Sequence, residues 1–184
     1  MAAGIASAIL LARGRVEGLR LLGHDLTAAA ASFRAAFICL PVFLAIKLLG
    51  WALEGVPPRG LGVALAAELA AYALTWAGYA LASKVLAEQA QAGPRWPHFI
   101  AAWNWANVVQ YALLAPLMLP VVLGAPGWLS NGLGLGLLCY AVWLEWFVAR
   151  HALGVSGPAA TLFVLLDLAL GLIVGGFAQR VAGG

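Results

Sequence analysis

The chain has 184 residues, of which 64% are hydrophobic and only 9% are Asp, Glu, Lys or Arg. A soluble domain is about 45–50% apolar and about 25% charged, so this composition excludes a soluble globular fold and predicts a helical protein in a lipid bilayer. The net charge of +3 comes without a long basic stripe, which excludes a nucleic-acid partner.

The chain begins with an apolar run that passes into a short basic cluster. Over residues 4–22, leucines are interspersed with Arg13, Arg15 and Arg20. The run is shorter than the roughly 17–25 apolar residues that cross a bilayer. We therefore expect residues 1–26 to be an N-terminal interfacial segment, in which an amphipathic helix lies on the membrane surface.

Five long apolar stretches follow, separated by short loops that contain Gly and Pro. They predict one all-α domain over residues 27–184, a polytopic bundle of five transmembrane helices. Asp25 or Thr27 can cap the helix that leads into the first span. The expected spans are residues 35–53, 61–82, 99–123, 133–150 and 158–179.

The distribution of basic residues predicts the orientation of the bundle. A cytoplasmic N-terminus and an outer C-terminus place most of the Lys and Arg side chains on the inner side, as the positive-inside rule favours. The composition, rich in Ala, Leu and Gly, suggests a bacterial inner membrane. The inner set is Arg13, Arg15, Arg20, Arg34, Lys84, Arg95 and Arg150, and the outer set is Lys47, Arg59 and Arg180.

Two charged residues of opposite sign lie at matching depths in the first two spans. Lys47 precedes the outer end of its span by about seven residues, and Glu68 follows the outer start of the next span by as many. At about 1.5 Å per residue both lie roughly 10 Å below the outer surface. We predict a Lys47–Glu68 ion pair, which either stabilises the helical hairpin or forms part of a coupling-ion or proton site.

Polar side chains also lie along one face of the second and of the third span. Tyr72 follows Glu68 by one helical turn in the second span. In the third span the polar side chains share an arc of about 120°, at 100° per residue. Such a face either forms hydrogen bonds between helices or lines a polar pocket with aromatic sides. The residues of the third span are Trp103, Asn104, Asn107, Gln110 and Tyr111.

Two acids interrupt the last two spans. Asp167 divides the apolar sequence FVLLDLALGL and is the acid nearest the middle of the membrane. Its expected partner is the amide face of the third span or a buried cation, although a protonated carboxyl is an alternative. Glu145 lies near the inner end of the fourth span, where Arg34 or Arg150 could pair with it.

The remaining motifs predict packing rather than chemistry. Gly171 and Gly175 form a GxxxG pattern, which permits close helix contact within the bundle, with a membrane-protein partner or with a second copy of the chain. His24, His98 and His151 show no metal-ligand spacing, and no serine lies in a nucleophile-elbow sequence. We expect no metal, no cofactor, no catalytic residues and no enzyme activity.

Three local sequences carry a family resemblance that extends over roughly residues 27–180. The sequences are Ala29-Ala30-Ala31-Ser32-Phe33-Arg34, Ser83-Lys84-Val85-Leu86 followed by Trp96-Pro97-His98-Phe99, and Arg150-His151-Ala152-Leu153-Gly154-Val155-Ser156 followed by Ala159-Ala160. They resemble segments of the Yip family of five-pass, Rab-interacting-type membrane proteins, in its prokaryotic branch. The resemblance implies a five-span architecture and a non-catalytic membrane role. The acidic, aromatic cytoplasmic arm of the eukaryotic members is missing here.

Two functions remain open at this point. An organising or accessory membrane subunit would have a dry interior in which polar groups pair with one another. A small-solute transporter or membrane substrate-binding subunit would have a cavity that opens to one side. Five spans divide poorly into two repeats, which favours the first function. The cavity of the second would be lined by Trp103, Asn104, Asn107, Gln110, Glu68, Tyr72 and Asp167.

Overall fold

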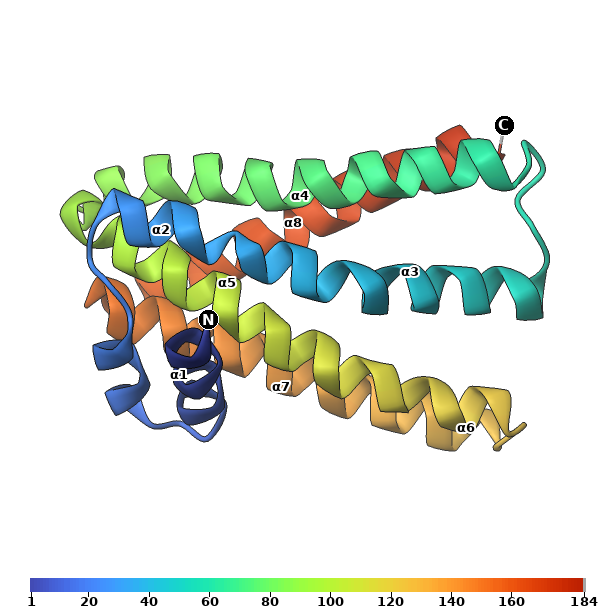
Figure 1. The fold of residues 1–184 in the computed structure, drawn as a ribbon, viewed down its shortest axis with the longest axis horizontal. Coiled ribbons are helices and arrows are strands. Elements are labelled where there is room, and N and C mark those ends of the chain that lie inside the picture. The colour runs from blue at the N-terminus through green and yellow to red at the C-terminus, as the bar shows by residue number, and fades with distance from the viewer. Residues whose placement is uncertain (184) are drawn as a thin grey trace.

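A computed structural model describes residues 1–183 as a bundle of helices without a strand in that range (Figure 1). The chain forms α-helices α1–α8 and three short 3-10 helices, η1–η3, within these residues. In chain order the elements are α1 (Ala2–Ala12), η1 (Val16–Leu21), α2 (Leu26–Ser32), α3 (Arg34–Glu54), α4 (Leu61–Gln89), η2 (Gly93–Arg95), α5 (Trp96–Leu114), η3 (Ala115–Leu117), α6 (Met118–Val122), α7 (Gly127–Leu153) and α8 (Gly157–Gly183).

Five helical stretches are long and apolar enough to cross a membrane, which confirms the predicted all-α bundle of five spans. The chain is therefore a five-pass membrane protein. Each stretch is longer than the predicted span, because the helix continues beyond the predicted apolar segment into the residues that flank it. The stretches are Leu26–Glu54, Leu61–Gln89, Gly93–Val122, Gly127–Leu153 and Gly157–Gly183.

The spans are arranged as two helix pairs with α3 alongside them (Figure 1). Helix α8 lies along α4, and α5 packs against α7 and α3. Helices α7 and α8 also contact each other and join the two pairs. The N-terminal end of the bundle contains α1, η1 and the turns from α4 to α5 and from α7 to α8, whereas the opposite end contains the α3–α4 loop and the C-terminus.

The N-terminal segment differs from the expected single helix over residues 4–22. Gly14 adopts a φ of +70° between α1 and η1, a left-handed conformation that ends the α-helix. Leu11 is fully buried, and Gly4 lies so close to the ring of Trp105 on α5 that a Cβ at this position would overlap it. The segment is therefore packed on the bundle through α1, because its small and apolar residues fit the surface of α5.

The first span is divided into two helices. Asp25 precedes α2, and its carboxylate accepts a hydrogen bond of 2.6 Å from the Ala28 amide, so it is the N-cap that the sequence allowed. Phe33 separates α2 from α3. In the third span, Pro116 lies within η3, where a proline removes an α-helical hydrogen bond and the helix changes to the 3-10 form.

Burial is distributed unevenly along the bundle. The first half of α5, from His98 to Asn107, is buried at every position, and none of the residues from Val108 to Val122 is. On α7, burial begins only at Leu144. The N-terminal half of the bundle is thus tightly packed, whereas the spans diverge toward the opposite end.

Candidate ligand pocket

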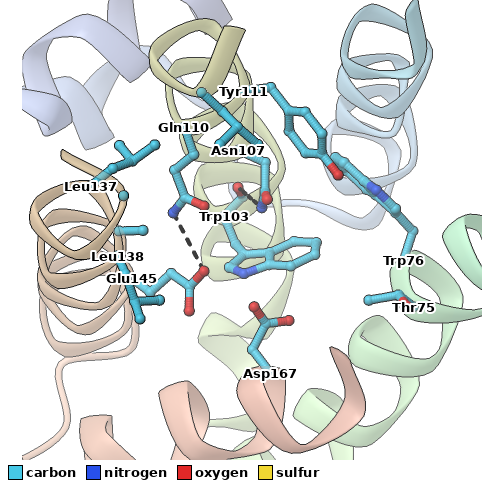
Figure 2. Close-up of a pocket in the computed structure, with 13 residues that line it drawn as sticks. Thr75, Trp76, Trp103, Asn107, Gln110, Tyr111, Leu137, Leu138, Glu145 and Asp167 are labelled. Carbon is cyan, nitrogen blue, oxygen red and sulfur yellow. Dashed lines mark hydrogen bonds between the residues drawn. The ribbon is translucent and has the colours of Figure 1, made fainter. Parts of the chain in front are cut away.

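A pocket of about 350 Å³ lies where the packed half of the bundle ends, between α4, α5, α7 and α8 (Figure 2). We call it the ligand pocket. Its size is within the range of about 300–1,000 Å³ that is usual for small-molecule sites. It is lined by Thr75, Trp76, Trp103, Asn107, Gln110, Tyr111, Leu114, Gly134, Leu137, Leu138, Ala141, Glu145 and Asp167.

Helix α5 contributes a row of polar and aromatic side chains because Trp103, Asn107 and Gln110 lie three to four residues apart on one face. The Asn107 amide Nδ2 donates to the Trp103 carbonyl at 3.0 Å, which leaves the Asn107 carbonyl oxygen available to the pocket. Gln110 Nε2 donates to Glu145 Oε1 at 3.4 Å, so this amide contacts the carboxyl group from the neighbouring helix (Figure 2).

Two acidic side chains face the pocket from neighbouring helices. Glu145 extends from α7 and Asp167 from α8, and both carboxyl groups point into the same space (Figure 2). Glu145 is only 7% exposed. None of the lining residues, all within the described chain, is Lys, Arg or His. A buried charge without an opposite charge costs several kcal/mol, so this pair requires protons or a cation.

Two polar atoms at the pocket have no hydrogen-bond partner within residues 1–183. They are the indole Nε1 of Trp103, a donor, and Oδ1 of Asp167, an acceptor. Trp103 is 2% exposed, and its Nε1 edge is turned toward the two carboxyl groups (Figure 2). The large majority of buried polar side-chain atoms in proteins are paired, and an unpaired one costs about 1–3 kcal/mol. These two atoms are therefore free to bond to a molecule in the pocket, either water or a solute.

Aromatic rings occupy the side of the pocket that faces α3 and α4. The rings of Trp76 and Trp103 lie 5.2 Å apart in an edge-to-face arrangement. The ring centroid of Tyr72 lies 5.9 Å from that of Trp76 and 6.4 Å from that of Tyr111. Figure 2 shows Tyr111 and Trp76 across the pocket from the side chains of α7. The pocket thus combines an aromatic side with an acidic side.

A second pocket of about 210 Å³ adjoins the ligand pocket and shares Thr75, Trp76 and Tyr111 with it. Lys47 Nζ lies 2.8 Å from Glu68 Oε1 here, so the structure brings the predicted ion pair together. The Tyr72 hydroxyl, on the same side, donates to the Ala36 carbonyl at 2.6 Å. Glu68 and Tyr72 therefore lie in this second pocket and not in the ligand pocket.

A third pocket of about 500 Å³ continues toward the opposite end of the bundle. It shares Lys47 and Glu68 with the second pocket and extends to the α3–α4 loop at Pro57 and to Gln179 of α8. The three pockets form a consecutive series from the opposite end to the two acids, with the ion pair between the second and the third.

Dense aromatic packing lies on the other side of the ligand pocket, toward the N-terminal end. Tyr79, Phe99 and Phe163 are each no more than 1% exposed. The rings of Tyr79 and Trp103 are stacked at 4.3 Å, and those of Phe99 and Phe163 meet at 5.3 Å. The series of pockets therefore stops at Trp103.

Two further sequence predictions need correction. Asn104 does not line the ligand pocket, because it points toward α2 and donates to Ser32 Oγ at 2.6 Å. Glu145 pairs with Gln110 and not with a basic residue, since Arg34 donates to the Ala31 carbonyl and Arg150 lies over the ring of Trp146.

Close helix packing at Gly171 and Gly175 was expected within the bundle, with a membrane-protein partner or with a second copy, and the structure does not show it within the bundle. A Cβ at either position would meet nothing within 4 Å. Both glycines line the second pocket instead. Because a glycine has no side chain, these two positions leave space for the second pocket.

The sequence predictions missed Trp76, and they assigned Glu145 to a charge pair rather than to a site. A signal was present for Trp76, which follows Tyr72 by one helical turn on the same face of α4. Within residues 1–183 no group of three His, Cys, Asp or Glu side chains is placed to hold a metal ion.

Comparisons with known proteins give no further relationship: no family model, no curated protein and no solved structure matches the chain.

Proposed function

We propose that this five-pass membrane protein binds a small solute in the ligand pocket, as a transporter or as a membrane substrate-binding subunit. One observation carries the proposal. An unpaired buried donor, Trp103 Nε1, and an unpaired acceptor, Asp167 Oδ1, face the same cavity inside an apolar bundle. A scaffold that only packs would gain stability from apolar residues at these positions.

The physical cost of this arrangement supports a role in binding. Ionisable residues within membrane spans are expensive and commonly mark substrate or ion pathways. Here two of them, Glu145 and Asp167, face one pocket that contains no basic side chain among its lining residues. A solute that supplies the missing partners would recover the cost on binding.

The series of pockets supports access from one side. It reaches from the opposite end of the bundle to Asp167, and dense packing around Phe99 closes the other side. In each of its two states, an alternating-access protein has a binding site that is open to one side of the membrane and closed to the other. In the orientation that the basic residues predict, the open side faces outward.

The second candidate is a non-enzymatic organising or accessory subunit, the role that a Yip-like architecture implies. The dry packing of the N-terminal half supports it, because α1 and α2 both pack on α5 and η1 packs on α1. This role requires no occupant in the ligand pocket.

Solute binding by the purified full-length chain distinguishes the two candidates. The protein in lipid nanodiscs would be screened by thermal unfolding against cationic, neutral polar and anionic small solutes. We expect at least one solute to raise the Tm, since a ligand at 100 times its Kd stabilises by about 2.7 kcal/mol.

The matched variants are Asp167→Asn in the pocket and Glu88→Gln outside it. Glu88 is exposed, and its carboxylate lies 4.0 Å from the ammonium group of Lys84, one turn away. The Tm shift should disappear in Asp167→Asn and persist in Glu88→Gln. No shift with any solute, or an equal shift in both variants, would leave the organising role as the better account.

A further inference from the structure

We infer that the solute of the ligand pocket is a small organic cation that carries an oxygen atom close to its charged nitrogen. This inference rests on the proposed function and adds the chemical class of the ligand. Three features of the pocket lead to it: the sign of its charge, its aromatic side and its unpaired donor.

The charge is the first feature. Two acidic residues, Glu145 and Asp167, line the pocket, and no lining residue within the described chain is basic. Lys47, the cation on the approach, is already held by Glu68 at 2.8 Å. An anionic solute would meet two carboxyl groups and no cation, whereas a cationic solute can take the place of the proton or cation that the buried pair requires.

The aromatic side is the second feature. Trp76 and Tyr111 line the pocket opposite the acids, and Trp103 continues this surface at 5.2 Å from Trp76. Aromatic faces attract alkylammonium groups by about 0.5–2 kcal/mol, and cages of such rings bind quaternary ammonium ligands. A bare metal ion would gain little from these rings. The combination favours an organic cation over an inorganic one.

The unpaired donor is the third feature. Trp103 is 2% exposed, and its Nε1–H has no acceptor within residues 1–183. A cationic nitrogen cannot accept this hydrogen bond. The donor is turned toward the carboxyl groups (Figure 2), so a hydroxyl or carbonyl oxygen beside the charged nitrogen would reach it. The ligand therefore carries both a cationic centre, for Asp167 and Glu145, and an oxygen acceptor, for Trp103.

Two probes of equal shape test the charge directly in the wild-type protein. Choline carries a trimethylammonium group and a hydroxyl, and dimethylbutanol is its neutral carbon isostere. Calorimetry on the full-length chain in nanodiscs should show choline binding at least about tenfold more tightly than dimethylbutanol. Equal affinity for the two probes, or tighter binding of the neutral one, would overturn the inference.

Variants test the assignment of each contact. Asp167→Asn should reduce the preference for choline over dimethylbutanol by about tenfold, while Glu88→Gln should leave it unchanged. Trp103→Phe keeps a ring and removes the donor, so it should weaken choline more than tetramethylammonium, which has no oxygen. An equal loss for both cations would overturn the role of the Trp103 N–H. If a variant does not fold, the comparison of the wild-type probes still decides the charge.

The outcomes also separate this inference from the proposed function. A neutral or anionic solute that binds and depends on Asp167, with no binding of choline or tetramethylammonium, would overturn the cationic ligand and leave solute binding standing. If no solute of any charge binds, both the inference and the proposed function are wrong.

Discussion

The two halves of the bundle use the same apolar composition in different ways. In the N-terminal half, large side chains such as Phe99 and Tyr79 interlock, and the segment of α1 covers the end. In the other half, α3, α5 and α7 bury few side chains, and consecutive pockets contain the ion pair and the acids. A membrane protein can leave the apolar side chains of one half exposed, because lipid, unlike water, solvates apolar surfaces. Tight packing is therefore found in the N-terminal half, and the pockets with polar side chains are found toward the opposite end of the bundle.

The largest effect should come from truncating a ring of the packed half. Phe99→Ala removes a side chain with 0% exposure that contacts Tyr79 and Phe163. We expect it to lower the free energy of unfolding by about 3–5 kcal/mol. Phe177→Ala, at a position on α8 that is 67% exposed, should change it far less. Similar losses in thermal or denaturant unfolding for both variants would contradict the difference between the halves.

A smaller effect is expected at the contact between the N-terminal helix and α5. Gly4→Ala would place a methyl group against the ring of Trp105, and overpacking of this kind costs about 1–3 kcal/mol. Gly50→Ala in α3 is the matched control, because a Cβ there meets nothing within 4 Å. Unfolding of both variants checks the packing of α1. Equal stability would mean that α1 is not held on the bundle.

The Lys47–Glu68 pair should have the smallest effect. The side chains of Lys47 and Glu68 are 32% and 9% exposed, so water in the adjoining pockets screens the pair in part, and we expect a net contribution of about 1 kcal/mol. A double-mutant cycle with Lys47→Met and Glu68→Gln measures the coupling. A coupling of several kcal/mol would show that this part of the opposite half is as dry as the packed half.

The spans could be predicted from the sequence because each needs only a sufficient length of apolar residues. The pairing of Lys47 with Glu68 could also be predicted, because depth in the membrane follows from residue number along adjacent antiparallel helices. Asp25 was an expected cap because its side chain suits the start of a helix. These features depend on one helix or on two neighbours in the chain.

The composition of the ligand pocket could be predicted only in part. Asn104 and Asn107 lie on the same arc of α5, yet only Asn107 faces the pocket, since Ser32 of α2 takes the other amide. The rotation of a helix is hard to infer when lipid and protein interior are both apolar, because the hydrophobic pattern does not distinguish them. The position of Glu145 depended on how α7 packs against α8, which no local pattern records.

Water access to the ligand pocket tests the central claim most directly. The two neighbouring variants Thr75→Cys and Leu74→Cys, in a background with Cys39→Ala and Cys139→Ala, would be treated with a charged, membrane-impermeant thiol reagent. Thr75 lines the ligand pocket, whereas Leu74 is 59% exposed on the outer surface of α4, where lipid surrounds it. We predict that Thr75→Cys is labelled and Leu74→Cys is not, and that a bound solute slows the labelling. Failure to label Thr75→Cys would contradict an accessible pocket and favour a bundle that only packs.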